Sequence, residues 1–129
     1  MKIDHIAIWV KDLEKMKDFY TKHFEMTAND KYVNEAKGFS SYFLTCKLGD
    51  TRIELMNRKD ITENLEHRDI LLGLTHLAIG LATREAVFSM TEQFRNEGIT
   101  IFSEPRITGD GYLESVIQDP EGNVIELVF

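Results

Sequence analysis

The sequence predicts an α+β protein built from two copies of one strand-helix-strand-strand-strand (βαβββ) unit. Three observations support this class: similar strings recur at matched spacing, each copy contains one amphipathic helical stripe, and alternating apolar stretches follow each helix. The recurring strings are IDHIAIWV (3–10) with LTHLAIGL (74–81), and RIELMN (52–57) with VIELVF (124–129). A duplicated unit explains all three observations.

The spacing of two polar residues inside these strings strengthens the case for duplication. His76 follows His5 by 71 residues, and Glu126 follows Glu54 by 72. One such match would carry little weight, because isolated histidines and glutamates are common. Two matches with the same neighbours indicate that the whole unit is repeated.

The elements of the first unit, residues 1–57, can be assigned in order. A strand over about 2–10 alternates apolar and polar residues. Asp12 is a suitable N-cap for a helix ending near residue 24, since apolar residues then recur at helical spacing. The remaining strands are expected at about 27–34, 39–47 and 50–57, with a Gly-Asp turn before the last.

The second unit, residues 73–129, repeats this order. Thr83 is the expected N-cap of its helix, and Gly98 stands where a C-terminal glycine belongs. Strands follow at about 99–103, 112–118 and 123–129, the last two joined by the turn DPEGN. The charged segment 58–72 is the expected linker, with room for a helical turn. All 129 residues are expected to form one domain in which two four-stranded sheets, related by pseudo-twofold symmetry, enclose a cleft.

Composition narrows the function classes. The net charge of −7 argues against binding nucleic acid or an acidic membrane surface, and no apolar stretch is long enough for a membrane span. Cys46 is the only cysteine, so no disulfide can form within the chain. We expect a cytoplasmic protein whose partner is a small molecule.

Side-chain alternation predicts where the repeated polar residues point. In each strand the neighbours of the His or Glu are aliphatic, and these neighbours lie on the opposite face of the sheet. The aliphatic face should pack on the helix, which directs the polar residues into the cleft. Two imidazoles and two carboxylates that converge there suit Zn²⁺, Ni²⁺, Co²⁺, Mn²⁺ or Fe²⁺. The candidate ligands are His5, Glu54, His76 and Glu126.

With these residues identified, the chain resembles the vicinal oxygen chelate superfamily, which includes glyoxalase I, bleomycin-resistance proteins and extradiol dioxygenases. The strings that carry the resemblance are DHIAIWVKDLEKMKDFY, RIELMN, LTHLAIGL and QDPEGNVIELVF. The resemblance implies paired βαβββ modules, one metal at the base of a U-shaped cleft, and often a homodimer.

Within that superfamily the ligand pattern is similar to glyoxalase I, because a Glu occupies the second ligand position at Glu54. The resemblance implies a lyase that moves a proton between adjacent carbons of a hemithioacetal through an enediolate. Glu126 would be the base, and Glu54 a ligand and second acid/base group. Three alternatives within the metal enzymes stay open: an epimerase, a dioxygenase and an antibiotic-modifying enzyme. A non-catalytic small-molecule-binding resistance protein is the fourth.

Substrate contacts are expected at three positions beside the ligands. Bacterial glyoxalase I has an Arg four residues after the first His, where this chain has Trp9. Its glutathione-contacting Asn corresponds to Asn57 with an offset of one, or to the position of Arg58. These departures leave three alternatives for the substrate: a glutathione adduct, the adduct of another thiol, or a different small oxygenated molecule.

Overall fold

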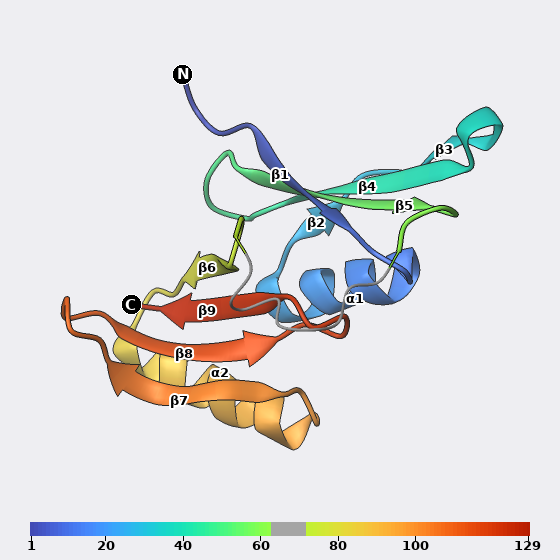
Figure 1. The fold of residues 1–129 in the computed structure, drawn as a ribbon. Coiled ribbons are helices and arrows are strands. Elements are labelled where there is room, and N and C mark those ends of the chain that lie inside the picture. Colours follow the sequence, from blue (N-terminus) through green and yellow to red (C-terminus); the bar gives the residue numbers. More distant parts are fainter. Residues whose placement is uncertain (63–71) are drawn as a thin grey trace. The chain divides into compact units, whose positions relative to one another are not determined.

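The computed structural model describes residues 1–62 and 72–129 of the chain (Figure 1). The chain divides into two compact units, Met1–Glu63 and Asn64–Phe129. Each unit has one sheet and one long helix, so the predicted α+β class is confirmed. Most of the expected linker, together with its helical turn, lies outside the described residues. None of the described helices combines the length and the apolar character needed to cross a membrane.

The first unit is a five-stranded sheet with one helix. Its elements are β1 (His5–Trp9), α1 (Leu13–Phe24), β2 (Thr27–Ala28), β3 (Tyr32–Asn34), a 3₁₀ turn (Glu35–Lys37), β4 (Phe39–Thr45) and β5 (Arg52–Arg58). The strand order is β1-β5-β4-β2, and β3 also pairs with β4. β1 runs parallel to β5, whereas β4 and β5 form an antiparallel hairpin.

Helix α1 begins where the sequence predicted. The Asp12 carboxylate accepts a hydrogen bond from the backbone N–H of Lys15 at 3.0 Å, which satisfies one donor of the first turn. The apolar stripe of α1 packs on β4 and β5. Met16 and Tyr20 on the helix, and Leu55 on the sheet, are fully buried. The aliphatic face of the sheet therefore lies under the helix, as the alternation predicted.

The second unit repeats this arrangement with a four-stranded sheet. Its elements are β6 (His76–Gly80), α2 (Arg84–Asn96), β7 (Ile101–Ile107), β8 (Leu113–Gln118) and β9 (Val124–Val128), in the sheet order β6-β9-β8-β7. β6 and β9 are parallel, as β1 and β5 are in the first unit. The two units thus share their strand order as well as their sequence strings.

Both predicted ends of α2 are confirmed. Thr83 accepts a hydrogen bond from the backbone N–H of Ala86 at 3.2 Å. Gly98 follows the helix with φ +75°, and its N–H donates to the carbonyl of Arg95 at 3.1 Å. Ile99 N–H donates to the carbonyl of Phe94 at 2.9 Å. These two bonds form a Schellman ending, which requires a left-handed residue at Gly98.

The expected strand 27–34 is the main difference from the sequence analysis. It is split into β2 and β3, because residue 29 bonds to β4 through its side chain. The Asn29 amide oxygen accepts the backbone N–H of Phe43 at 2.7 Å, and Asn29 N–H donates to the Phe43 carbonyl at 3.1 Å. Asparagine side chains compete with backbone pairing in this way. The split adds a strand to the sheet of the first unit.

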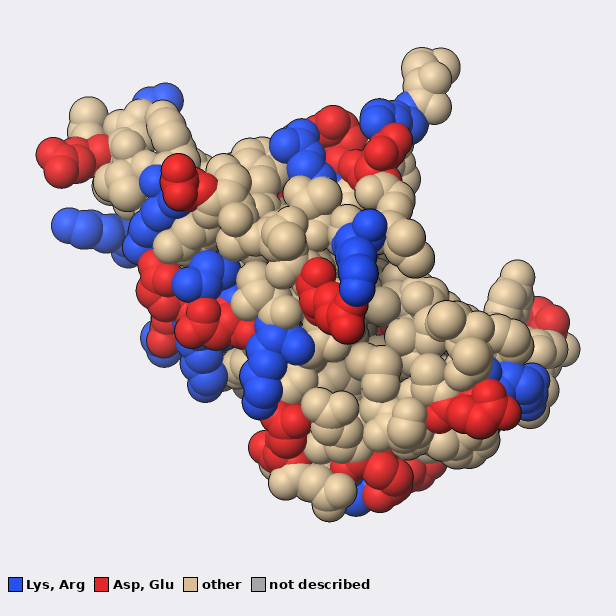
Figure 2. Space-filling model, turned by 180° about the vertical axis from the view of Figure 1, so that it is seen from behind, with Lys and Arg blue, Asp and Glu red and all other residues tan. Residues whose placement is uncertain are grey.

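Charged side chains of both signs are distributed over the surface. On the face seen in Figure 2, acidic and basic side chains are interspersed, and neither sign forms a continuous field.

Candidate metal half-sites and the adjoining hollow

The first predicted ligand pair comes from the parallel strands β1 and β5. His5 stands opposite Arg52, and Ala7 opposite Glu54. His5 and Glu54 are therefore diagonal neighbours on one face, whereas Ile53 and Leu55 point to the buried face. His5 Nε2 lies 3.7 Å from Glu54 Oε2. We call this His–Glu pair the first half-site.

The second unit contains an equivalent pair in the same register. His76 stands opposite Val124, and Ala78 opposite Glu126. His76 Nε2 lies 3.3 Å from Glu126 Oε2. In both half-sites the carboxylate is the more deeply set group, at 16% and 21% exposed, against 38% and 42% for the imidazoles. We call this pair the second half-site.

Both half-sites have a donor set and spacing that suit a divalent cation. Two ligand atoms about 2.1 Å from one ion at the tetrahedral angle lie about 3.4 Å apart. The observed separations of 3.7 and 3.3 Å bracket this value and exceed an ordinary hydrogen bond. Among the described residues, no three His, Cys, Asp or Glu side chains gather into a metal-binding group. Each unit by itself thus brings together one His–Glu pair.

The imidazole of the first half-site is held from two further sides. His5 Nδ1 lies 3.0 Å from Asp4 Oδ2, and a carboxylate only accepts, so Nδ1 carries the proton and Nε2 is free to ligate. The His5 ring also meets Phe43 edge-on, at 5.2 Å between centroids. Asp4 is in turn paired with Arg52. The hydrogen bond from His5, and then that from Arg52, hold the pKa of Asp4 below its usual value.

The three substrate-contact predictions divide into two groups in the structure. Trp9 and Arg58 come together, with the guanidinium carbon 5.3 Å from the indole centroid. Asn57 is on the other face of β5 from Glu54, by alternation. Its amide donates to the carbonyls of Val10 at 2.7 Å and Lys11 at 3.1 Å. This side chain therefore ties the end of β1 to β5.

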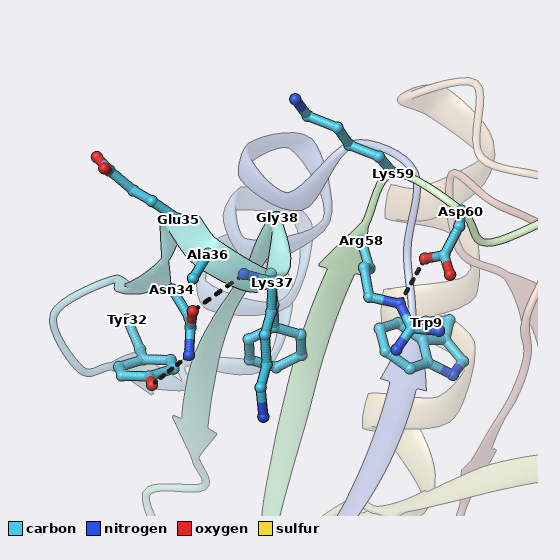
Figure 3. A pocket seen from close by; sticks show the side chains of 11 residues that line it. Trp9, Tyr32, Asn34, Glu35, Ala36, Lys37, Gly38, Arg58, Lys59 and Asp60 are labelled. Atoms are coloured by element: carbon cyan, nitrogen blue, oxygen red, sulfur yellow. Dashed lines mark hydrogen bonds and ion pairs between the residues drawn. The ribbon is translucent and has the colours of Figure 1, made fainter.

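Trp9 and Arg58 line an open hollow of about 800 Å³ on the first unit (Figure 3). Tyr32 and Phe39 supply two further rings, and Asn34 and Lys37 contribute polar groups. Tyr32 was not among the substrate-contact residues that the sequence predicted. Tyr32 pairs with Ser41 of β4. This pairing could not be predicted while residues 27–34 were expected to form a single strand.

The fold and the paired half-sites define a class: two βαβββ units, each with a His–Glu pair on its first and last strands. A model of the Glyoxalase/Bleomycin resistance protein/Dioxygenase superfamily matches residues 2–127. The chain therefore belongs to this superfamily, as its sequence strings predicted. By sequence, the chain matches none of the curated proteins.

Solved structures similar to this one include glyoxalase I enzymes. A V278E mutant of glyoxalase I from Zea mays is 25% identical, with a TM-score of 0.78 over 98% of this chain and 44% of that one. The trypanothione-dependent glyoxalase I of Leishmania major is 24% identical, with a TM-score of 0.79 over 99% of this chain and 86% of that one.

A glyoxylase/bleomycin resistance protein/dioxygenase domain from Frankia is 15% identical, with a TM-score of 0.83 over 100% of this chain and 97% of that one. The chain spans less than half the length of the maize enzyme, whereas it spans nearly all of the Frankia domain. The fold is thus shared with proteins of quite different lengths.

Proposed function

We propose that this protein is a metal-dependent lyase or isomerase of the glyoxalase I type. The observation that carries the proposal is the matched pair of half-sites, with His Nε2 and Glu Oε2 separated by 3.7 Å in one unit and 3.3 Å in the other. The similarity to glyoxalase I structures supports it. The proposal includes Glu54, since a carboxylate at this ligand position is the feature that separates glyoxalase I from the dioxygenase pattern.

We further propose that the two half-sites share one divalent ion, so that both units act as one domain. The sharing could occur within one chain or between two chains of a homodimer. When bound, the ion would act as a Lewis acid toward two adjacent oxygens of a small substrate. Glu126 would take a proton from one carbon and return it to the neighbouring carbon, with Glu54 serving the opposite stereochemistry.

The limited exposure of Glu54 and Glu126 supports the roles proposed for these carboxylates. Both carboxylates are less exposed than their imidazole partners, so their orientation is restrained by the sheet rather than set by solvent. A positioned carboxylate at hydrogen-bond distance from a carbon-bound proton contributes roughly 10²–10⁴-fold to a proton-transfer rate. The co-substrate would be a thiol that forms a hemithioacetal with a 2-oxoaldehyde.

Metal content tests the shared ion. Purified protein loaded with Zn²⁺ or Ni²⁺ and dialysed against a weak chelator should keep one ion per pair of half-sites. The double variant His5→Ala/Glu54→Ala should keep none, although the second half-site is intact. Two ions in the unmodified protein and one in the variant would show separate sites, and would contradict the sharing.

Thioester formation from methylglyoxal tests the reaction. The assay uses glutathione and several other thiols with Zn²⁺- and Ni²⁺-loaded protein. Glu126→Gln should lower kcat about 10²-fold or more while the ion is retained, as expected for loss of the proton-transfer group. Glu85→Gln, on the exposed first turn of α2, is the matched control and should leave kcat unchanged. An ion-loaded protein with no turnover for any thiol would exclude the glyoxalase I reaction.

A further inference from the structure

The hollow on the first unit lies on the same face of the sheet as the first half-site. Trp9 is four residues beyond His5 on β1, and Arg58 is four beyond Glu54 on β5, and even separations keep side chains on one face. At about 3.3 Å per residue, the hollow is about 13 Å from the half-site. A substrate that reached both would be an elongated molecule with a reacting head and a separate tail.

Aromatic rings dominate the walls of the hollow. Trp9 meets Phe39 edge-on at 6.2 Å between centroids, and Tyr32, on the neighbouring strand β3, meets Phe39 at 6.1 Å. Trp9 and Tyr32 are nevertheless 44% and 53% exposed. Aromatic side chains that are this exposed in a concave site gain burial when a flat apolar group lies against them. The walls thus suit a ring.

The charged groups around these rings favour an anion. Arg58 pairs with Asp60 through Nε, and its terminal amino groups make no further hydrogen bond to a described residue. Lys37 extends on the side of the hollow where Tyr32 and Trp9 lie, whereas Glu35 points away from them (Figure 3). The Lys37 ammonium makes no ion pair within the described part of the chain. Local positive charge in a chain of net charge −7 marks a position suited to an acidic group.

We propose that this hollow binds the tail of the substrate, and that the tail is a flat aromatic ring bearing an acidic group. The ring would lie against Trp9 and Tyr32, and the acid would meet Arg58 and Lys37. The link to catalysis rests on the proposed function, but the hollow can be tested in protein without metal. A glutathione tail fits less well, because it carries carboxylates but no ring to cover the aromatic walls.

The chain offers a site-specific reporter, because Trp9 is its only tryptophan. The single indole N–H signal of ¹⁵N-labelled protein can be followed by NMR in the presence of a chelator. Three probes separate ring from charge: 2-naphthoate, the uncharged 2-naphthalenemethanol, and cyclohexanecarboxylate. We expect 2-naphthoate to shift the indole signal saturably and to bind at least about fivefold more tightly than either other probe. Equal affinities, or an unmoved indole signal, would overturn the proposal.

Two variants assign the effect to the named side chains. Arg58→Gln should lower the affinity for 2-naphthoate part of the way toward that for 2-naphthalenemethanol, because Lys37 remains, and should leave the affinity for 2-naphthalenemethanol unchanged. Arg84→Gln, an exposed residue at the start of α2, removes the same charge elsewhere and should change neither. Tyr32→Ala should weaken both ring probes and leave cyclohexanecarboxylate unaffected. Unchanged 2-naphthoate binding in Arg58→Gln would refute the placement of the acid.

The metal content of the same preparations separates this inference from the proposed function. Protein that retains a divalent ion but ignores 2-naphthoate contradicts the aromatic-acid tail and leaves the metal-dependent reaction standing. Protein that binds 2-naphthoate at Trp9 but takes up no ion supports the hollow and contradicts the metal-dependent reaction.

Discussion

Replacing Asp4 by asparagine removes one negative charge and keeps nearly the same shape. In the structure Asp4 Oδ2 lies 3.0 Å from His5 Nδ1, on the far side of the imidazole from Glu54. A carboxylate in this position fixes the imidazole tautomer and makes the opposite nitrogen a better metal ligand. Asparagine can still accept the hydrogen bond, but it does so without charge. We therefore expect Asp4→Asn to weaken metal binding while the imidazole stays oriented.

The structure sets the size of this effect. Loss of such a hydrogen-bond partner commonly costs about 10–100-fold in metal affinity. Asp4 should fall at the low end, because its side chain is 60% exposed and it shares its charge with Arg52. We expect about a tenfold loss for Asp4→Asn, or about 1.4 kcal/mol. Asp4→Ala should lose more, since nothing then accepts the proton of Nδ1.

Competition for Zn²⁺ with a chromophoric chelator measures these affinities. The second unit offers a matched control, because Thr75 precedes His76 as Asp4 precedes His5. Thr75→Ala should change the affinity less than twofold by this reasoning, since Thr75 brings no charge to His76. The thermal midpoint of metal-free protein checks that folding is intact. Equal affinities for Asp4→Ala, Thr75→Ala and the unmodified protein would refute the role assigned to Asp4.

Two further predictions concern stability. Hydrogen bonds, chiefly from Lys31, lower the pKa of Glu14 to about 2, so its contribution is complete above its usual pKa near 4.5 and is lost as pH falls toward 2. Since Glu14 is half-exposed, Glu14→Gln should lower the free energy of unfolding by only about 0.5 kcal/mol at neutral pH, measured by urea titration. Near pH 2 the same substitution should have no effect. An equal loss at both pH values would contradict the ionic origin of the contribution. Gly98→Ala should cost about 1–2 kcal/mol in the same assay, because φ is +75° and no atom crowds the position; an unchanged midpoint would show that the helix end relaxes.

Those features of the fold that depend on local pattern were predictable from the sequence. Alternation alone placed the aliphatic neighbours of Glu54 under α1, and Ile53 and Leu55 are indeed buried there. The helix starts at Asp12 and Thr83 followed from side-chain chemistry that acts within three residues. Such features need no knowledge of distant contacts, which is why the sequence was sufficient.

Features that depend on contacts between distant residues were not predictable in this way. The break after β2 depends on Asn29 reaching Phe43 on β4, and Asn57 bonds to carbonyls at the end of β1. The hollow depends on the same break, which sets Tyr32 beside Phe39. Asp4 stands next to His5 in the sequence, but its contact with the imidazole depends on the side-chain conformations in the fold.

The register of the two units shows where the duplicated halves have diverged. The counterparts in the second unit of Asp4, Arg52 and Phe43 are the neutral residues Thr75, Val124 and Val116, because they hold the same places relative to the His–Glu pair.

Trp9 is likewise matched by Gly80. The His–Glu pair is thus common to both units, whereas Asp4, Arg52, Phe43 and Trp9 have no charged or aromatic counterpart at the matching places of the second. If the proposed function holds, the first unit supplies both the better supported imidazole and the binding site for the substrate tail. The second unit then supplies Glu126 as the proton-transfer group, which divides recognition and chemistry between the two copies of one ancestral unit.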